Sequence, residues 1–163
     1  MLCRSLAGLR EERVNWKGLP MNLTRIALAA IAAFVAYFAI GGLVFAALPW
    51  LKNEFRRYPA VYRPQEAIGS VMPAGMAAMF VAMVVLAVIY AMLYRGGSGL
   101  AEGARFGVLI GVFAVCAFVV HNYVNLNIGL KLTLEQGAAY FVEWTVVGMV
   151  IGLIYKPALL GAH

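Results

Sequence analysis

Aspartate is missing from this chain, and its seven acidic side chains are all glutamates. Charged residues make up only 12% of the 163 residues, whereas about 25% is usual in soluble globular domains. This composition therefore argues against a soluble domain. The net charge of +6 comes from cations that border hydrophobic segments and form no basic face, so we expect no nucleic-acid partner.

Residues for covalent and metal chemistry are equally scarce. The two cysteines, Cys3 and Cys116, form neither a CxxC motif nor a Cys/His spacing that binds zinc. We therefore expect neither a disulfide nor a metal site. The chain contains no GxSxG elbow, Walker loop, HExxH motif or paired-carboxylate pattern. These absences favour a non-enzymatic protein, and no cofactor is indicated.

Long hydrophobic runs dominate the chain, in which 64% of residues are hydrophobic. A membrane-spanning helix needs about 20 mostly apolar residues, whereas transmembrane β-strands are about 10 residues long and alternate in polarity. The runs are too long and too uniform for strands. We predict an all-α integral membrane four-helix bundle within residues 21–163, with helices at residues 26–48, 71–94, 104–126 and 136–155.

A polar, charged leader, residues 1–20, precedes Met21. It is either an artefact of start-codon choice or a short amphipathic segment in the cytoplasm. With the leader included, eight cations lie on the side of the chain ends and five on the other. This excess predicts a multi-pass membrane protein with both termini in the cytoplasm. A start at Met21 changes the ratio to four against five and removes the preference.

The two halves of the chain show a possible internal repeat. Residues 77–95 align without a gap with residues 138–156, and Phe80 then matches Phe141 while Tyr94 matches Tyr155. This alignment raises the possibility of two repeated helical hairpins, a device that some transporters use. The glutamate at position 143 has no counterpart in the first hairpin, where Ala82 occupies the equivalent place.

Six glycines recur at a spacing of four residues, which places them along one face of each predicted helix. A glycine face lets the backbone of another helix approach closely. The neighbour could belong to the same chain, to a second copy in a homo-oligomer, or to a partner membrane subunit. The helix-packing residues are Gly99, Gly103, Gly107, Gly111, Gly148 and Gly152.

A small polar set interrupts the third and fourth predicted helices. From the predicted spans, His121 and Glu143 lie at a similar depth in the bilayer and form a pair. One interpretation is that these residues form hydrogen bonds that hold neighbouring helices together. A second is that they form a site for a ligand, an ion or a proton. A third is that His121 ligates haem or a metal. A single histidine is a poor metal site without a second strong ligand. The candidate residues are His121, Asn122, Asn125, Tyr140 and Glu143.

Cations and methionines mark the region around the first loop. Arg56, Arg57 and Arg63 lie among aromatic residues in the loop 51–70, where they could attract an anionic solute to a vestibule or bind lipid headgroups. Pro59 and Pro64 argue against one continuous helix there. A methionine stripe on the second predicted helix suits core or lipid-facing packing, a protein partner or Cu(I). Its members are Met72, Met76, Met79 and Met83.

Three segments carry a resemblance to a known class of proteins: YRGGSGLAEGARFGVLIG, HNYVNLNIG and VEWTVVGMVIGLIYKP. Through them, residues 21–157 resemble the small four-helix bacterial inner-membrane proteins of unassigned function. The resemblance implies a four-helix membrane protein and implies no activity, because those families have none assigned.

Two functional hypotheses follow from these patterns. The first is a non-enzymatic membrane protein that acts by helix packing through its glycine faces, as a homo-oligomer or an accessory subunit surrounded by membrane lipid. The alternative is a small transporter or channel-like protein with a protonatable His121/Glu143 site.

Overall fold

The computed structural model describes residues 21–155, which form an all-α fold without strands. Four helical spans, Leu23–Ala47, Gln65–Leu93, Gly99–Asn125 and Leu130–Ile154, are long and apolar enough to cross a membrane. The prediction of an all-α fold with four such helices is therefore confirmed. The elements are α1 (Leu23–Ala47), α2 (Pro49–Arg56), α3 (Gln65–Leu93), α4 (Gly99–Ala114), the π-helical turn η1 (Val115–Val120), α5 (His121–Asn125) and α6 (Leu130–Ile154). The predicted leader, residues 1–20, lies outside the described residues.

The helices α3 and α6 begin six residues earlier than the hydrophobic runs predicted. α3 starts at Gln65 and α6 at Leu130, because a first turn in the interface can be polar while the helix is already formed. Pro73, which falls in the first turn of the helix predicted at residues 71–94, therefore lies inside α3. As predicted, no single helix crosses the first loop, since α2 ends at Arg56.

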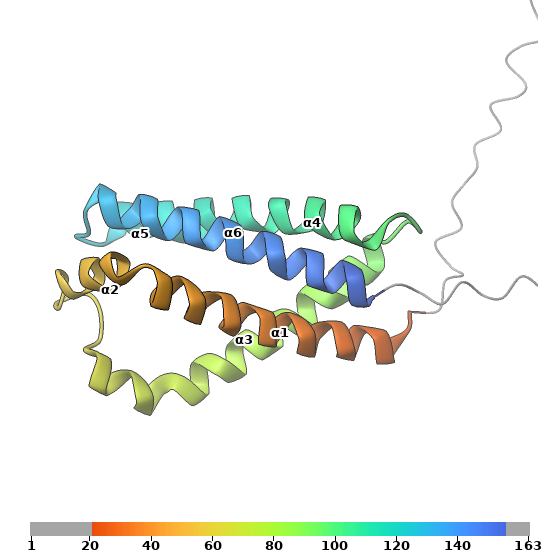
Figure 1. The fold of residues 1–163 in the computed structure, drawn as a ribbon, viewed down its shortest axis with the longest axis horizontal. Coiled ribbons are helices and arrows are strands. Elements are labelled where there is room, and N and C mark those ends of the chain that lie inside the picture. The colour runs from red at the N-terminus through yellow and green to blue at the C-terminus, as the bar shows by residue number, and fades with distance from the viewer. Residues whose placement is uncertain (1–20, 156–163) are drawn as a thin grey trace, which may run out of the picture.

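The spans pack in the order α3, α1, α6, α4, with α1 and α6 in the centre (Figure 1). The first and last described helical ends meet, because Arg25 Nη1 donates a hydrogen bond of 3.3 Å to the carbonyl of Ile154. Both ends of residues 21–155 therefore lie on one side of the membrane. Which side faces the cytoplasm stays a prediction, as does the duplication of two hairpins.

The four spans close tightly at the end where the chain enters and leaves. Aromatic rings from α3, from α4 and from the residues that follow α3 and α6 meet there. Tyr90 lies 5.4 Å from Phe106 and 5.9 Å from Tyr155 between ring centroids, and Tyr94 lies 5.8 Å from Tyr155. Small α1 residues, Ala29, Ala30 and Ala33, are fully buried beneath this cluster and allow close helix contact. The main core therefore lies at this closed end.

At the opposite end, α3 separates from the other spans (Figure 1). Every residue from 68 to 78 is exposed, so no face of this part of the helix is buried. Pro73 lies in its middle, has no N–H for a bond to the Gly69 carbonyl, and its ring crowds that carbonyl. Figure 1 shows α3 changing direction in its N-terminal part. The bundle is therefore open on this side, next to α2.

Candidate functional site

The glycine faces of α4 and α6 pack against each other within the chain. A Cβ atom at Gly103 would lie 2.5 Å from the carbonyl oxygen of Gly148, and one at Gly107 would lie 2.6 Å from that of Thr145. From the other side, a Cβ at Gly152 would meet the carbonyl of Gly99. Backbone atoms cannot retreat from such contacts, so only glycine allows these two helices to approach so closely.

Gly111 faces Phe141 in the same interface, where a Cβ would lie 3.2 Å from the ring. All six predicted packing glycines therefore lie between α4 and α6. Of the neighbours that the sequence allowed, the structure places one from the same chain there. These faces leave no room for a second copy or another subunit between α4 and α6.

The polar residues at the end of the third span point elsewhere. His121, Asn122 and Asn125 are all exposed on α5, and the Asn125 side-chain amide donates a 3.1 Å hydrogen bond to the His121 carbonyl. They lie next to the π-helical turn η1, whose residues Val115 and Val119 pack toward Gly137 of α6. The three residues therefore cluster at one helix end, apart from Glu143.

The predicted pair of His121 with Glu143 is not formed, because the two residues lie at different depths. His121 is four residues from the end of its span at Asn125, or about 6 Å at 1.5 Å per residue. Glu143 is 13 residues from the start of α6 at Leu130, or about 20 Å from the same side. The prediction was wrong because α6 begins six residues before the apolar run, which moves Glu143 to mid-span.

Glu143 lies between α6 and α1 and is only 8% exposed. Its carboxyl faces Gly41, where a Cβ would lie 2.9 Å from Oε1. The hydroxyl-bearing side chains of Tyr37 and Tyr140 are its electrostatic neighbours. No cation lies within ion-pair distance of Glu143 anywhere in residues 21–155. The structure thus brings Tyr140 and Glu143 together with two α1 residues, Tyr37 and Gly41, that the sequence did not single out.

A second unpaired polar group lies beside this carboxyl. The indole N–H of Trp144 is buried and has no hydrogen-bond partner among the described residues. Its ring lies against Tyr37, with 5.4 Å between ring centroids. Among the described residues, the α1/α6 seam therefore holds, at mid-span, a carboxyl without a cation and a buried indole N–H without a hydrogen-bond partner.

A cavity of about 280 Å³ lies in the same seam, nearer the open end. Its lining includes Val44 of α1, Leu48 directly after α1, and Glu135 and Val142 of α6. Val142 directly precedes Glu143, and Val44 lies one turn from Gly41. Glu135 Oε2 is buried without a hydrogen-bond partner. The cavity therefore extends from Glu135 near the interface as far as Val142, and Glu143 itself is not part of its lining.

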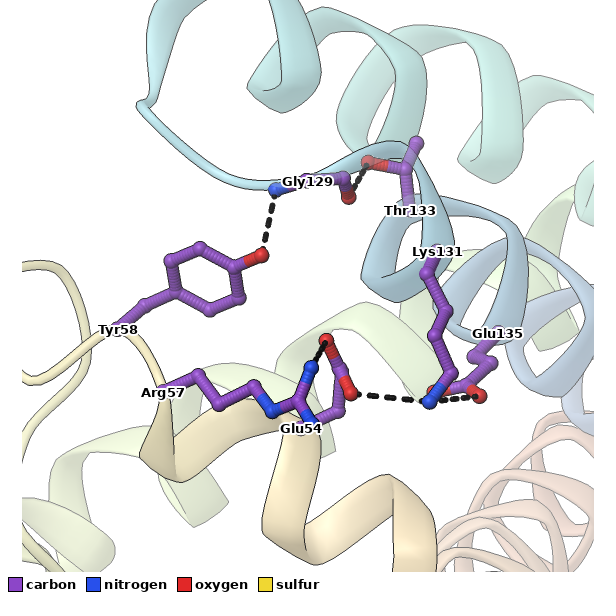
Figure 2. A network of polar contacts seen from close by, with 7 residues as sticks. All are labelled: Glu54, Arg57, Tyr58, Gly129, Lys131, Thr133 and Glu135. Atoms are coloured by element: carbon purple, nitrogen blue, oxygen red, sulfur yellow. Dashed lines mark hydrogen bonds and ion pairs between the residues drawn. The ribbon is translucent and has the colours of Figure 1, made fainter.

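A polar network that the sequence did not reveal holds α2 onto the start of α6 (Figure 2). Glu54 is 3% exposed, and its carboxylate lies 3.1 Å from Lys131 Nζ and 3.4 Å from Arg57 Nη1. Lys131 also lies 3.8 Å from Glu135. In the sequence, Glu54 lies between the cations of α2, and Lys131 is expected on the same side of the membrane. This alternation of charge was the only sign that Glu54 forms ion pairs. The pairing itself depends on the tertiary fold.

Hydrogen bonds extend this connection along the loop that follows α2. The backbone N–H of Gly129 donates to the Tyr58 hydroxyl at 2.9 Å, and Gln136 Nε2 donates to the Tyr62 hydroxyl at 3.3 Å. The Thr133 hydroxyl donates a 3.2 Å hydrogen bond to the Gly129 carbonyl (Figure 2). Leu51, Ile128 and Leu132 form a small core beneath these bonds. The loop is thereby fixed to α6 and leaves α3 unsupported at this end.

The three loop arginines divide between two environments. Arg57 belongs to the Glu54 network, whereas Arg56 and Arg63 line a large pocket between α2 and α3. The methionine stripe is divided too, because Met83 is fully buried in the core while Met72 and Met76 are exposed. Neither set therefore acts as a single surface.

Within residues 21–155, no group of three His, Cys, Asp or Glu side chains is placed so as to hold a metal ion. The resemblance to small bacterial inner-membrane proteins stays a prediction. No protein-family model, curated protein or solved structure matches this chain.

Proposed function

We propose that this multi-pass membrane protein is a small transporter in which Glu143 binds and releases a proton. The observation that carries the proposal is the Glu143 carboxyl, buried at mid-span against Gly41, with no cation beside it in the described chain. An ionised carboxylate there costs several kcal/mol, so the group is neutral when its surroundings are dry. Ionisable groups in such places commonly mark proton or ion pathways.

The groups around Glu143 support a route toward it. Glu135 lines the cavity near the interface, and Glu143 follows two turns deeper on α6, about 12 Å further along the axis. Tyr37 and Tyr140 are electrostatic neighbours of Glu143, and their hydroxyls can donate and accept hydrogen bonds. His121 has no part in this route because it is exposed at the start of α5.

The proposal is tested by labelling with dicyclohexylcarbodiimide, an apolar reagent that reacts with protonated carboxyl groups. In proteoliposomes, we expect one adduct on Glu143, formed faster as the pH is lowered because the reactive form carries the proton. Glu143→Gln should abolish the adduct, and Glu66→Gln, which alters an exposed glutamate, should leave it unchanged. Absence of an adduct on Glu143 at every pH would contradict the proposal.

Transport itself is tested by imposing a pH gradient on the same vesicles and following a trapped pH-sensitive dye. We expect wild-type protein to dissipate the gradient faster than Glu143→Gln. Equal rates for the two proteins, across gradients of both directions, would argue that Glu143 only stabilises the α1/α6 contact.

A second candidate function is assembly with another membrane protein or a second copy, favoured by residues 68–78 of α3. These residues are exposed on all faces and include Ala74 and Gly75. A Cβ at Gly75 meets no atom within 4 Å, so Gly75→Leu should leave the chain folded. Native mass spectrometry from the native membrane should then show a complex that Gly75→Leu removes. A wild-type monomer would exclude this function.

A further inference from the structure

A large pocket lies at the open end, between the end of α1, α2 and the start of α3, and has a volume of about 1070 Å³. This volume exceeds the range of about 300–1,000 Å³ typical of small-molecule pockets. The pocket exists because α3 diverges from α1 there, while the loop after α2 is held toward α6 (Figure 1).

The pocket lining is apolar on the helices that enter the membrane. Phe45 of α1 and Ile68 and Met72 of α3 contribute hydrophobic surface. Phe55 extends it toward the interface, with its ring centroid 5.7 Å from that of Phe45 and 4.9 Å from that of Tyr62. Aromatic rings of this kind favour the boundary between acyl chains and headgroups. The pocket therefore passes from an apolar part into an interfacial one.

Cations gather at the interfacial part of the pocket. Lys52, Arg56 and Arg63 line it together with a single acidic residue, Glu66. Among residues 21–155, none of these three cations lies within ion-pair distance of a carboxylate, and Arg56 bonds only to the neutral Gln65 side chain, at 3.3 Å. Arg57, by contrast, is already paired with Glu54. The pocket therefore carries unneutralised positive charge, which complements an anion.

We propose that this pocket binds one anionic phospholipid. Its phosphate group lies among Lys52, Arg56 and Arg63, and one acyl chain lies along Phe45, Ile68 and Met72. Each basic residue near a membrane surface contributes about 1 kcal/mol of attraction to anionic lipid, equivalent to about a fivefold change in affinity. The site is separate from Glu143 and does not depend on proton transfer there.

The test uses the full chain in nanodiscs that contain phosphatidylglycerol and phosphatidylcholine with identical acyl chains. After partial delipidation, native mass spectrometry should show one phosphatidylglycerol retained in preference to phosphatidylcholine. The double variant Arg56→Gln/Arg63→Gln should weaken this retention by about 25-fold, or about fivefold for each cation removed. Arg95→Gln removes a charge outside the pocket and should leave retention unchanged.

A second variant tests the apolar part without altering charge. Gly69 lines the pocket, and a Cβ there meets no atom within 4 Å, so Gly69→Trp adds a bulky side chain at an open position of the lining. We expect it to expel the lipid while circular dichroism stays that of the wild type. Equal retention of the two lipids, or full retention in both pocket variants, would overturn the proposal. Displacement of the bound lipid by inorganic phosphate alone would overturn it too, since the site would then recognise only the anion.

Discussion

At the scale of single residues, two glycines make room for different kinds of neighbour. A Cβ at Gly148 would lie 2.5 Å from the Gly107 backbone nitrogen and 2.6 Å from the Gly103 carbonyl oxygen. A Cβ at Gly41 would meet only the end of the Glu143 side chain. Backbone in a packed helix cannot move aside, whereas a carboxyl can rotate. Gly148 therefore allows the close packing of two helices, whereas Gly41 leaves space for the carboxyl of the candidate site.

Gly148→Ala should lower the free energy of unfolding by about 1–3 kcal/mol, the usual cost of overfilling a packed interface. Gly42→Ala is the matched control, because a Cβ there has no atom within 4 Å. Thermal unfolding followed by circular dichroism measures both variants. Equal melting temperatures for Gly148→Ala and wild type would show that α4 and α6 are not in this close contact.

Gly41→Ala should keep the fold and slow carbodiimide labelling of Glu143, because the added methyl group occupies the space in front of the carboxyl. Gly42→Ala again serves as the control and should label at the wild-type rate. An unchanged rate in Gly41→Ala would mean that Glu143 does not face α1.

At the scale of elements, α2 is a short helix that depends on the rest of the chain for its position. It has eight residues, too few for an isolated helix to be stable in water. Pro49 begins it, and the Glu54 network and the Leu51 contact place it against the start of α6. Because α2 and its loop are bound to α6, the first residues of α3 are kept away from α1, and the pocket stays open.

Lys131→Met should loosen α2 because Glu54 then keeps only its exposed partner Arg57. Lys131 is itself 59% exposed, so solvent screening limits the loss to about 1 kcal/mol. Hydrogen–deuterium exchange should become faster in residues 49–58, and Lys52→Met, which removes an unpaired cation from the same helix, should not change it. Identical hydrogen–deuterium exchange in the two variants would contradict the proposal that the Glu54–Lys131 ion pair holds α2 in place.

At the scale of the whole molecule, the chain is closed at one end and open at the other. Aromatic rings from α3, α4 and the end of α6 meet at the closed end, whereas residues 68–78 of α3 are all exposed at the open end. Lipid can solvate an apolar helix on all sides, so this separation costs little in a membrane although it would expose hydrophobic surface in water.

Spin-label distances should report this asymmetry in a background where Cys3 and Cys116 are replaced by Ser. The pair Leu23→Cys/Leu93→Cys spans the closed end and should give a narrow distance distribution. The pair Ala46→Cys/Ile68→Cys spans the pocket and should give a broad one, because no packing contact holds α3 there. Equally narrow distributions would indicate that α3 is fixed along its whole length.

The four spans and their all-α character were readable from the sequence, because long apolar runs in lipid must satisfy their backbone groups within helices. The glycine spacing also predicted close packing, since a face without side chains has no other common use. The helix starts were less readable: hydropathy responds to apolar side chains, while a helix continues through polar interfacial turns such as those at Gln65 and Lys131.

The sequence by itself determined that this is a helical membrane chain, that its glycines bring helices together and that Glu143 lies inside a span. Only the tertiary structure decided the neighbours. It placed the glycine faces within one chain, Glu143 against Gly41 rather than His121, and Glu54 beside Lys131. Composition fixes which segments enter the lipid, because transfer depends on each segment alone. Partners depend on helix rotation and depth, which are set by packing between segments far apart in the sequence.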